Sequence, residues 1–85
     1  MGLKLKVNWY DKKSELLVGK EYSKDFGDDD FLIHETISPN EENIINNGIF
    51  DLEQEWISQI QNHISHKIDM SKYDYFIAFE YNDTW

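Results

Sequence analysis

Near both ends of this 85-residue chain, apolar residues recur at every second position, and this pattern constrains the fold more than any other feature. Every second residue from Leu3 to Trp9 is apolar, and every second residue from Tyr73 to Tyr81 is aromatic or aliphatic. Side chains alternate between the two faces of a strand, so this period of two predicts two strands that each turn one face toward a core. A chain of this length has room for one modest core, and we expect residues 1–85 to form a single domain.

The next segment indicates a hairpin. Residues 11–14 are polar and predict a turn, and residues 16–26 return to an extended pattern. In that second strand we expect Val18 and Tyr22 to point inward. The residues expected to point outward are Leu17, Gly19, Glu21 and Ser23.

A short helix is predicted after the hairpin. The three aspartates at 28–30 precede the apolar residues of segment 31–37, and carboxylates are favoured at the positive end of a helix. Pro39 is expected to end the helix. Residues 40–48 are typical of a loop, in which Asn46 and Gly48 tolerate a positive φ.

Residues 49–65 fit two patterns. Apolar residues recur every four positions through Ile64, which favours a helix. A strand over 49–56 is the alternative, and its cost is that Gln54 falls in the inward row. The residues that this strand would turn inward are Phe50, Leu52 and Trp56, and those outward are Ile49, Asp51, Glu53 and Glu55. Periodicity leaves both patterns open.

Charge limits the classes of partner. Acidic residues outnumber basic ones by 17 to 8, which gives a formal net charge of −9, and all the basic residues are lysines. We expect no direct binding to nucleic acid, because such binding needs a concentrated positive face. The excess of acid favours either solubility alone or a basic protein partner. The chain has no cysteine and its start is not continuously apolar, so we expect a cytoplasmic protein without a membrane segment.

No motif predicts catalysis or metal binding. His63 and His66 lack the spacing of a zinc site, and the aspartates at 28–30 lack that of a calcium loop. None of the serines lies in a nucleophile elbow. We therefore expect a binding protein and not an enzyme, with no cofactor and no metal.

Candidate binding residues gather on the outward side of the predicted sheet if residues 49–56 form a strand. These partner-binding candidates are Tyr10, Leu17, Ile49, Asp51, Glu53, Glu55, Phe76 and Glu80. Apolar and aromatic side chains among carboxylates are typical of a surface that binds a cationic protein. A single exposed apolar residue is ordinary, so the prediction depends on their clustering.

Short blocks in order along the whole chain carry a family resemblance. They are residues 1–5, 21–29, 46–48, 50–51, 55–56, 68–69, 75–76 and Trp85. In these blocks the chain resembles the cloacin and ribonuclease-colicin immunity proteins. Block 21–29, Glu-Tyr-Ser-Lys-Asp-Phe-Gly-Asp-Asp, is the most specific of them.

The resemblance implies an α+β fold, a four-stranded antiparallel sheet with one short helix between its second and third strands. It favours a strand over about 47–56 and leaves 57–65 either helical or irregular, because the prolines typical of the family are missing there.

The resemblance also implies tight one-to-one binding to the nuclease domain of a cognate bacteriocin that cleaves small-subunit ribosomal RNA. Tyr10 and Phe76 match the family's aromatic contact positions, Leu17 replaces an aromatic residue, and Ile49 takes a position linked to partner discrimination. Release from the cell as a complex with the toxin is a further expectation. An acidic regulator or adaptor that binds another basic protein is the alternative function.

Overall fold

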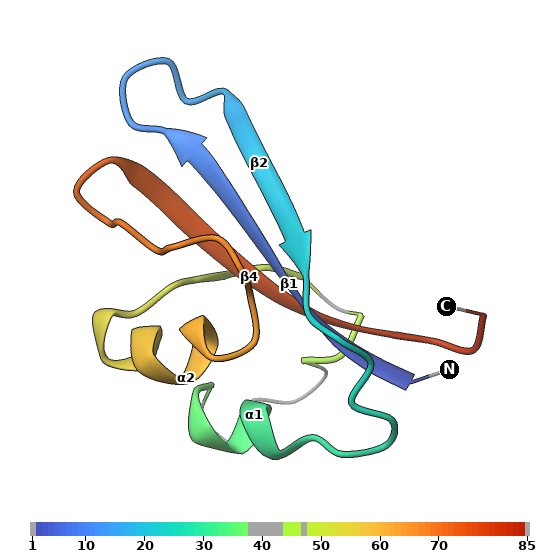
Figure 1. The fold of residues 1–85 in the computed structure, drawn as a ribbon. Coiled ribbons are helices and arrows are strands. Elements are labelled where there is room, and N and C mark those ends of the chain that lie inside the picture. The colour runs from blue at the N-terminus through green and yellow to red at the C-terminus, as the bar shows by residue number, and fades with distance from the viewer. Residues whose placement is uncertain (1, 38–43, 47, 85) are drawn as a thin grey trace.

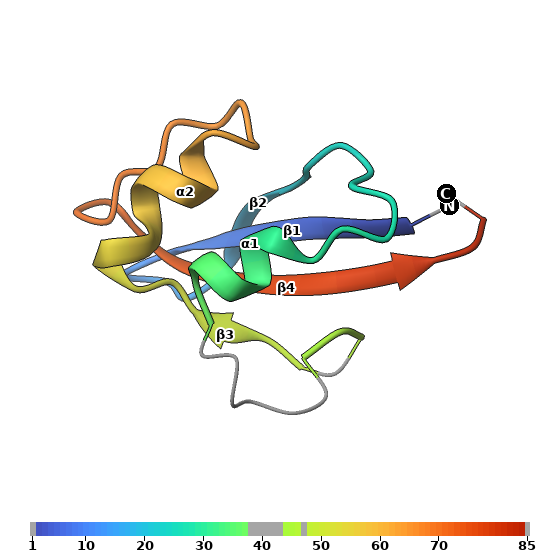
Figure 2. The same ribbon diagram turned by 90° about the horizontal axis from the view of Figure 1, so that it is seen from below.

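The computed structural model describes residues 2–37, 44–46 and 48–84, which form a four-stranded antiparallel sheet and short helices (Figure 1 and Figure 2). The strands are β1 (Gly2–Asp11), β2 (Leu17–Tyr22), β3 (Phe50–Asp51) and β4 (Tyr73–Asn82), in the order β2-β1-β4-β3. The two ten-residue strands β1 and β4 pair along their whole length, which places the two alternating segments side by side. The predicted fold class, α+β with a four-stranded antiparallel sheet, is confirmed.

Two short helices cover one face of this sheet, as Figure 2 shows. Helix α1 (Phe31–Glu35) lies between β2 and β3 as predicted, and the Asp29 carboxylate accepts a hydrogen bond from the Phe31 N–H at 3.0 Å. Helix α2 (Ile57–Gln61) is a second helix, and it lies within segment 57–65, which the sequence left either helical or irregular. Pro39, the expected helix stop, lies outside the described residues; α1 has already ended at Glu35.

The core lies between the sheet and the two helices. We name the covered side of the sheet the inner face and the opposite side the outer face. Residues from both layers are almost completely buried in the core: Leu3, Leu5, Val7, Ile77 and Phe79 from the sheet, Leu32 from α1 and Ile60 from α2. Since the helices cover only the inner face, the described elements leave the outer face without a second layer (Figure 1).

Two residues of β2 that the sequence placed outward, Gly19 and Glu21, lie on the inner face, and so does Ser23 just after the strand. Gly19 pairs with Trp9 and Glu21 pairs with Val7, and directly paired residues share a face of the sheet. Ser23 is also buried, and its hydroxyl accepts a hydrogen bond from the Leu5 N–H at 2.9 Å. The prediction for these three positions was wrong.

An irregularity in the pairing of β1 with β2 explains the error. The register shifts between Trp9 and Tyr10, so that Tyr10 pairs with Leu17 and Val18 is the extra residue. Leu17 therefore lies on the outer face as predicted, whereas Val18 is 51% exposed and Tyr22 pairs with Lys6 on the outer face. A one-residue shift moves every later side chain to the other face.

Segment 49–65, which fitted both a helix and a strand in the sequence, contains both kinds of structure. Strand β3 is only two residues long, and Gln54–Trp56 forms a 3₁₀ helix, η1, that leads into α2. The strand expected over about 47–56 is thus too long, because the chain turns away from the sheet after Glu53; Asn47 lies outside the described residues. The turn brings Trp56 against the core from the helical layer.

The edge of β4 is occupied by short segments. The side-chain amide of Asn46 donates a hydrogen bond to the Tyr81 carbonyl and accepts one from the Tyr81 N–H, both at 3.0 Å. Ile45 forms an isolated bridge with Phe79, and the Leu52 N–H donates to the Tyr75 carbonyl. Asn46 has a φ of 58° and Gly48 a φ of 103°, as their residue types predicted.

Candidate partner-binding face

The outer face carries most of the predicted partner-binding residues. Pairing registers place Tyr10, Leu17, Asp51, Phe76 and Glu80 on it. Tyr10 lies between Leu17 on β2 and Asp74 on β4, and Phe76 pairs with Asp51 on β3. The topology therefore brings residues from all four strands onto one surface.

Tyr10 and Phe76 form the aromatic centre of this face. Their ring centroids are 5.5 Å apart and their planes are inclined by 81°, an edge-to-face geometry that is favourable for aromatic pairs. The pair lines an open hollow of about 330 Å³ together with Glu15, Ile49 and Asp74. Each ring supports the other, so the pair presents a preformed apolar surface to a partner.

Exposed aliphatic side chains flank the aromatic pair. Ile49 is 60% exposed, and it also borders Lys6, Ala78 and Glu80 in a neighbouring hollow. On the other side, Leu17 is 53% exposed and continues an apolar run that includes Leu16, which is 70% exposed. The prediction missed Leu16, although the run Leu16-Leu17-Val18 was a usable signal, because a strand with one buried face cannot hide three consecutive apolar residues.

Glu80 is already paired within the fold. Its carboxylate lies 3.5 Å from the Lys6 ammonium and accepts a hydrogen bond from the Tyr22 hydroxyl at 3.3 Å. The Lys6 nitrogen also lies 5.8 Å from the centre of the Tyr22 ring. The negative charge of Glu80 is therefore balanced locally, and it adds less to the acidity of the outer face than its residue type suggested.

The two remaining acidic candidates lie beyond the sheet. Glu53 keeps an extended backbone, with φ −83° and ψ 144°, and stands at the rim just after β3. Glu55 lies in η1, so the strand interpretation that placed it in the outward row is wrong. Both side chains are exposed.

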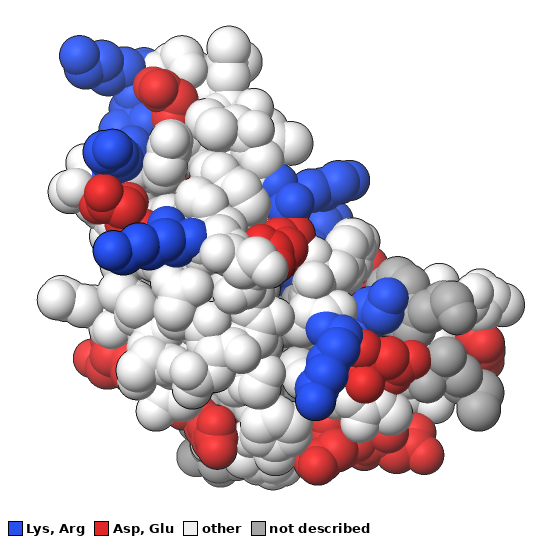
Figure 3. Space-filling view, in the orientation of Figure 1, with Lys and Arg blue, Asp and Glu red and all other residues white. Residues whose placement is uncertain are grey.

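Acidic side chains are densest at the end of the molecule that holds both termini. Figure 3 shows red side chains crowded there with a few blue ones beside them, and further blue side chains over the opposite end. The Tyr81 hydroxyl donates a hydrogen bond to Asp28 at 3.0 Å, which raises the pKa of Tyr81 together with burial and with the charges of Asp28, Asp83 and Asp25. The outer face carries charges of both signs, and this acidic end is separate from its aromatic centre.

The inner face holds a polar network that fixes the loop between α2 and β4. The Glu21 carboxylate accepts hydrogen bonds from the N–H groups of Ser65 at 2.6 Å and His66 at 2.9 Å. Burial works against ionisation of Glu21, but these two N–H groups and the nearby His66 outweigh it and lower the pKa of Glu21. The His66 ring stacks on Trp9 and its Nε2 lies 2.7 Å from the Tyr75 hydroxyl. Side chains of the three strands β1, β2 and β4 thus hold the loop in place.

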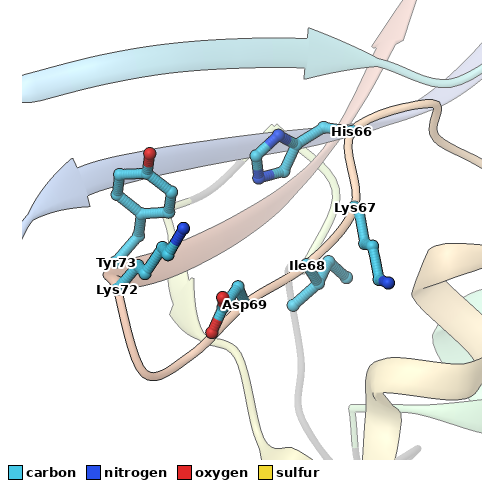
Figure 4. A pocket seen from close by; sticks show the side chains of 6 residues that line it. All are labelled: His66, Lys67, Ile68, Asp69, Lys72 and Tyr73. Atoms are coloured by element: carbon cyan, nitrogen blue, oxygen red, sulfur yellow. The ribbon is translucent and has the colours of Figure 1, made fainter.

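A hollow of about 400 Å³ opens along this loop. Figure 4 shows that its side chains are spread along the backbone from His66 to Tyr73 and do not converge on a single point. In the ranges that the structure describes, no three side chains of the metal-binding types gather into a metal site. None of the described helices is long and apolar enough to cross a membrane.

Comparison with known protein families gives one further finding. The family model described as "Cloacin immunity protein" matches residues 2–82. The match spans every strand and helix described above, including the outer face and the loop anchored by Glu21.

Proposed function

The chain belongs to the cloacin immunity protein family, whose members bind a cognate bacteriocin, and we propose that it neutralises the toxin by binding the toxin's ribonuclease domain one to one. We propose that the outer face of the sheet is the binding surface. Tyr10, Phe76, Leu17 and Ile49 would supply the apolar contacts, and Asp51 and Glu53 would supply acidic contacts on one side.

The aromatic pair is the observation that supports this surface best. Aromatic side chains offer a large contact area and have few rotamers to fix, which makes them common centres of binding energy in interfaces. Tyr10 and Phe76 hold each other in place before any partner arrives. A partner would therefore lose little conformational entropy in ordering them.

Net charge supports a basic partner. A domain with a formal charge of −9 attracts a cationic nuclease and speeds the encounter of the two proteins. Once bound, an acidic domain beside an RNA-binding cleft would exclude the ribosome by its bulk and by repulsion of RNA phosphates. No catalytic step is needed, and this inhibition would operate in the cytoplasm, where ribosomes are.

A translation assay tests this function. The ribonuclease domain of a cloacin-type bacteriocin is added to a cell-free translation mixture, alone and after mixing with an equimolar amount of the chain. We expect the nuclease alone to stop translation by cleaving small-subunit ribosomal RNA and the equimolar mixture to remain active. If translation stops equally in both mixtures and no complex forms by calorimetry, the proposed function is wrong.

A further inference from the structure

One row of four side chains crosses the outer face from a positive end to a negative end. Lys20 on β2 pairs with Asn8 on β1, Asn8 pairs with Phe76 on β4, and Phe76 pairs with Asp51 on β3. Neighbouring strands lie about 4.8 Å apart, so the backbones at the two ends of the row are separated by about 14 Å. A lysine and an aspartate thus stand on opposite sides of an aromatic ring.

The fold leaves these two charges available to a partner. Lys20 and Asp51 are both exposed, and neither has an ion pair or a side-chain hydrogen bond among the described residues. Several other charged residues of this face have partners within the fold. Lys6 is paired with Glu80, and Lys12 lies 2.9 Å from Asp74.

We propose that the face recognises a partner surface with an acidic group opposite Lys20, a basic group opposite Asp51 and an apolar group against Phe76. This inference rests on the proposed function and specifies the chemistry of the nuclease surface. A uniformly acidic face would attract a basic protein in many orientations, whereas charges of opposite sign at the two ends of one row favour a single orientation.

A charge-reversal variant distinguishes a uniformly acidic face from a face with opposite charges at its two ends, because the two predict opposite changes in affinity. Lys20→Glu makes the protein more acidic, so a face that binds by general negative charge would bind a basic nuclease more tightly. The oriented row predicts the opposite, because the new carboxylate would face an acidic group of the partner. We expect Lys20→Glu to raise the Kd for the nuclease domain by about tenfold, mainly through faster dissociation.

Matched controls separate the row from overall charge. Lys67→Glu makes the same change in net charge on the exposed loop of the inner side, and we expect its Kd to stay at the wild-type value or fall. Asp51→Lys should weaken binding as Lys20→Glu does, whereas Glu35→Lys on helix α1 should weaken it far less. If Lys20→Glu does not fold, Lys20→Ala replaces it. We expect Lys20→Ala to raise the Kd by about threefold to fivefold, because it removes the positive charge without adding a negative one.

Surface-plasmon resonance or stopped-flow mixing with the ribonuclease domain of a cloacin-type bacteriocin measures the Kd of each variant, and circular dichroism verifies that each variant is folded. Wild-type chain that does not bind this domain overturns the proposed function and this inference with it. If the wild-type chain binds the domain and Lys20→Glu binds it as tightly or more tightly, the proposed function stands. In that case only the proposed role of the row from Lys20 to Asp51 is wrong.

Discussion

Trp9 and His66 stack face to face, with ring centroids 3.8 Å apart and planes inclined by only 9°. Trp9 belongs to β1 and His66 to the loop between α2 and β4, so the stack joins the central sheet to a segment 57 positions later in the chain. Gly19, paired with Trp9 on β2, leaves room for the indole, because a Cβ built there would lie 2.6 Å from Cζ2 of Trp9.

Gly19→Ala should therefore destabilise the fold by about 1–3 kcal/mol, because the added methyl group overlaps the indole and forces it out of its packed position. Urea unfolding at neutral pH measures the change. Lys20→Ala, the neighbouring exposed position on the same strand, is the control and should stay within about 0.5 kcal/mol of wild type. Equal stability of Gly19→Ala and wild type would contradict the close packing of Trp9 on Gly19.

Glu21→Gln should destabilise the protein by about 1–3 kcal/mol at pH 7, because an amide side chain cannot accept the hydrogen bonds of Ser65 and His66 with both of its terminal atoms. The folded state lowers the pKa of Glu21 from its ordinary value of 4.5, so the ionised carboxylate stabilises the fold above that pH. This contribution is lost as the pH falls below 4.5 through the lowered pKa.

The difference between wild type and Glu21→Gln should accordingly shrink between pH 5 and pH 3 in thermal unfolding experiments. Glu53→Gln, an exposed position, is the control and should show little effect at either pH. A deficit of Glu21→Gln that stays constant from pH 7 to pH 3 would show that charge on Glu21 does not matter.

Tyr10→Ala and Phe76→Ala should each weaken binding to the nuclease domain by about 2–4 kcal/mol, expressed mainly as faster release. Both rings lie on the outer face, so the variants should keep their fold by circular dichroism. Leu5→Ala and Val7→Ala remove fully buried side chains and should instead lower stability by about 2–4 kcal/mol. If both aromatic variants bind as tightly as wild type, the outer face is not the binding surface.

Association should be electrostatically steered. A charge of −9 on a domain of this size predicts an association rate of roughly 10⁸ M⁻¹s⁻¹ or more at low salt, with a steep fall as ionic strength rises. Stopped-flow mixing over a range of salt concentrations measures this dependence. A rate that does not change with salt would mean that charge plays no part in the encounter.

The regular parts of the fold were predictable because the strands β1 and β4 each bury one complete face. Leu5 and Val7 alternate with polar residues, and Ile77 and Phe79 belong to the row of aromatic and aliphatic residues at every second position of β4, so the period of two was a direct signal. The positions of Tyr10 and Phe76 on the other face followed from the same alternation.

The faces of β2, the structure of residues 49–61 and the pairing of Glu80 depend on contacts between distant residues, which the sequence pattern of one segment does not reveal. The shift at Val18 inverts the rest of β2, and only the pairing with β1 reveals that Gly19 accommodates Trp9. Residues 49–61 satisfy a strand pattern as far as Leu52 and a helical one from Trp56 to Ile60, because both halves face the same core from different layers. The neutralisation of Glu80 by Lys6 likewise requires the pairing of β1 with β4.

The Asn46 side chain has a consequence for the behaviour of the protein at high concentration. Unpaired strand edges are templates on which other chains add strands and aggregate. At Tyr81 this amide takes up both the N–H and the carbonyl that a neighbouring strand would use, while Ile45 and Leu52 bond to the edge nearer the middle of β4. If the chain acts by the one-to-one capture that we propose, the cell must hold it in at least the amount of its target, and filling this edge of the sheet removes one template for polymerisation.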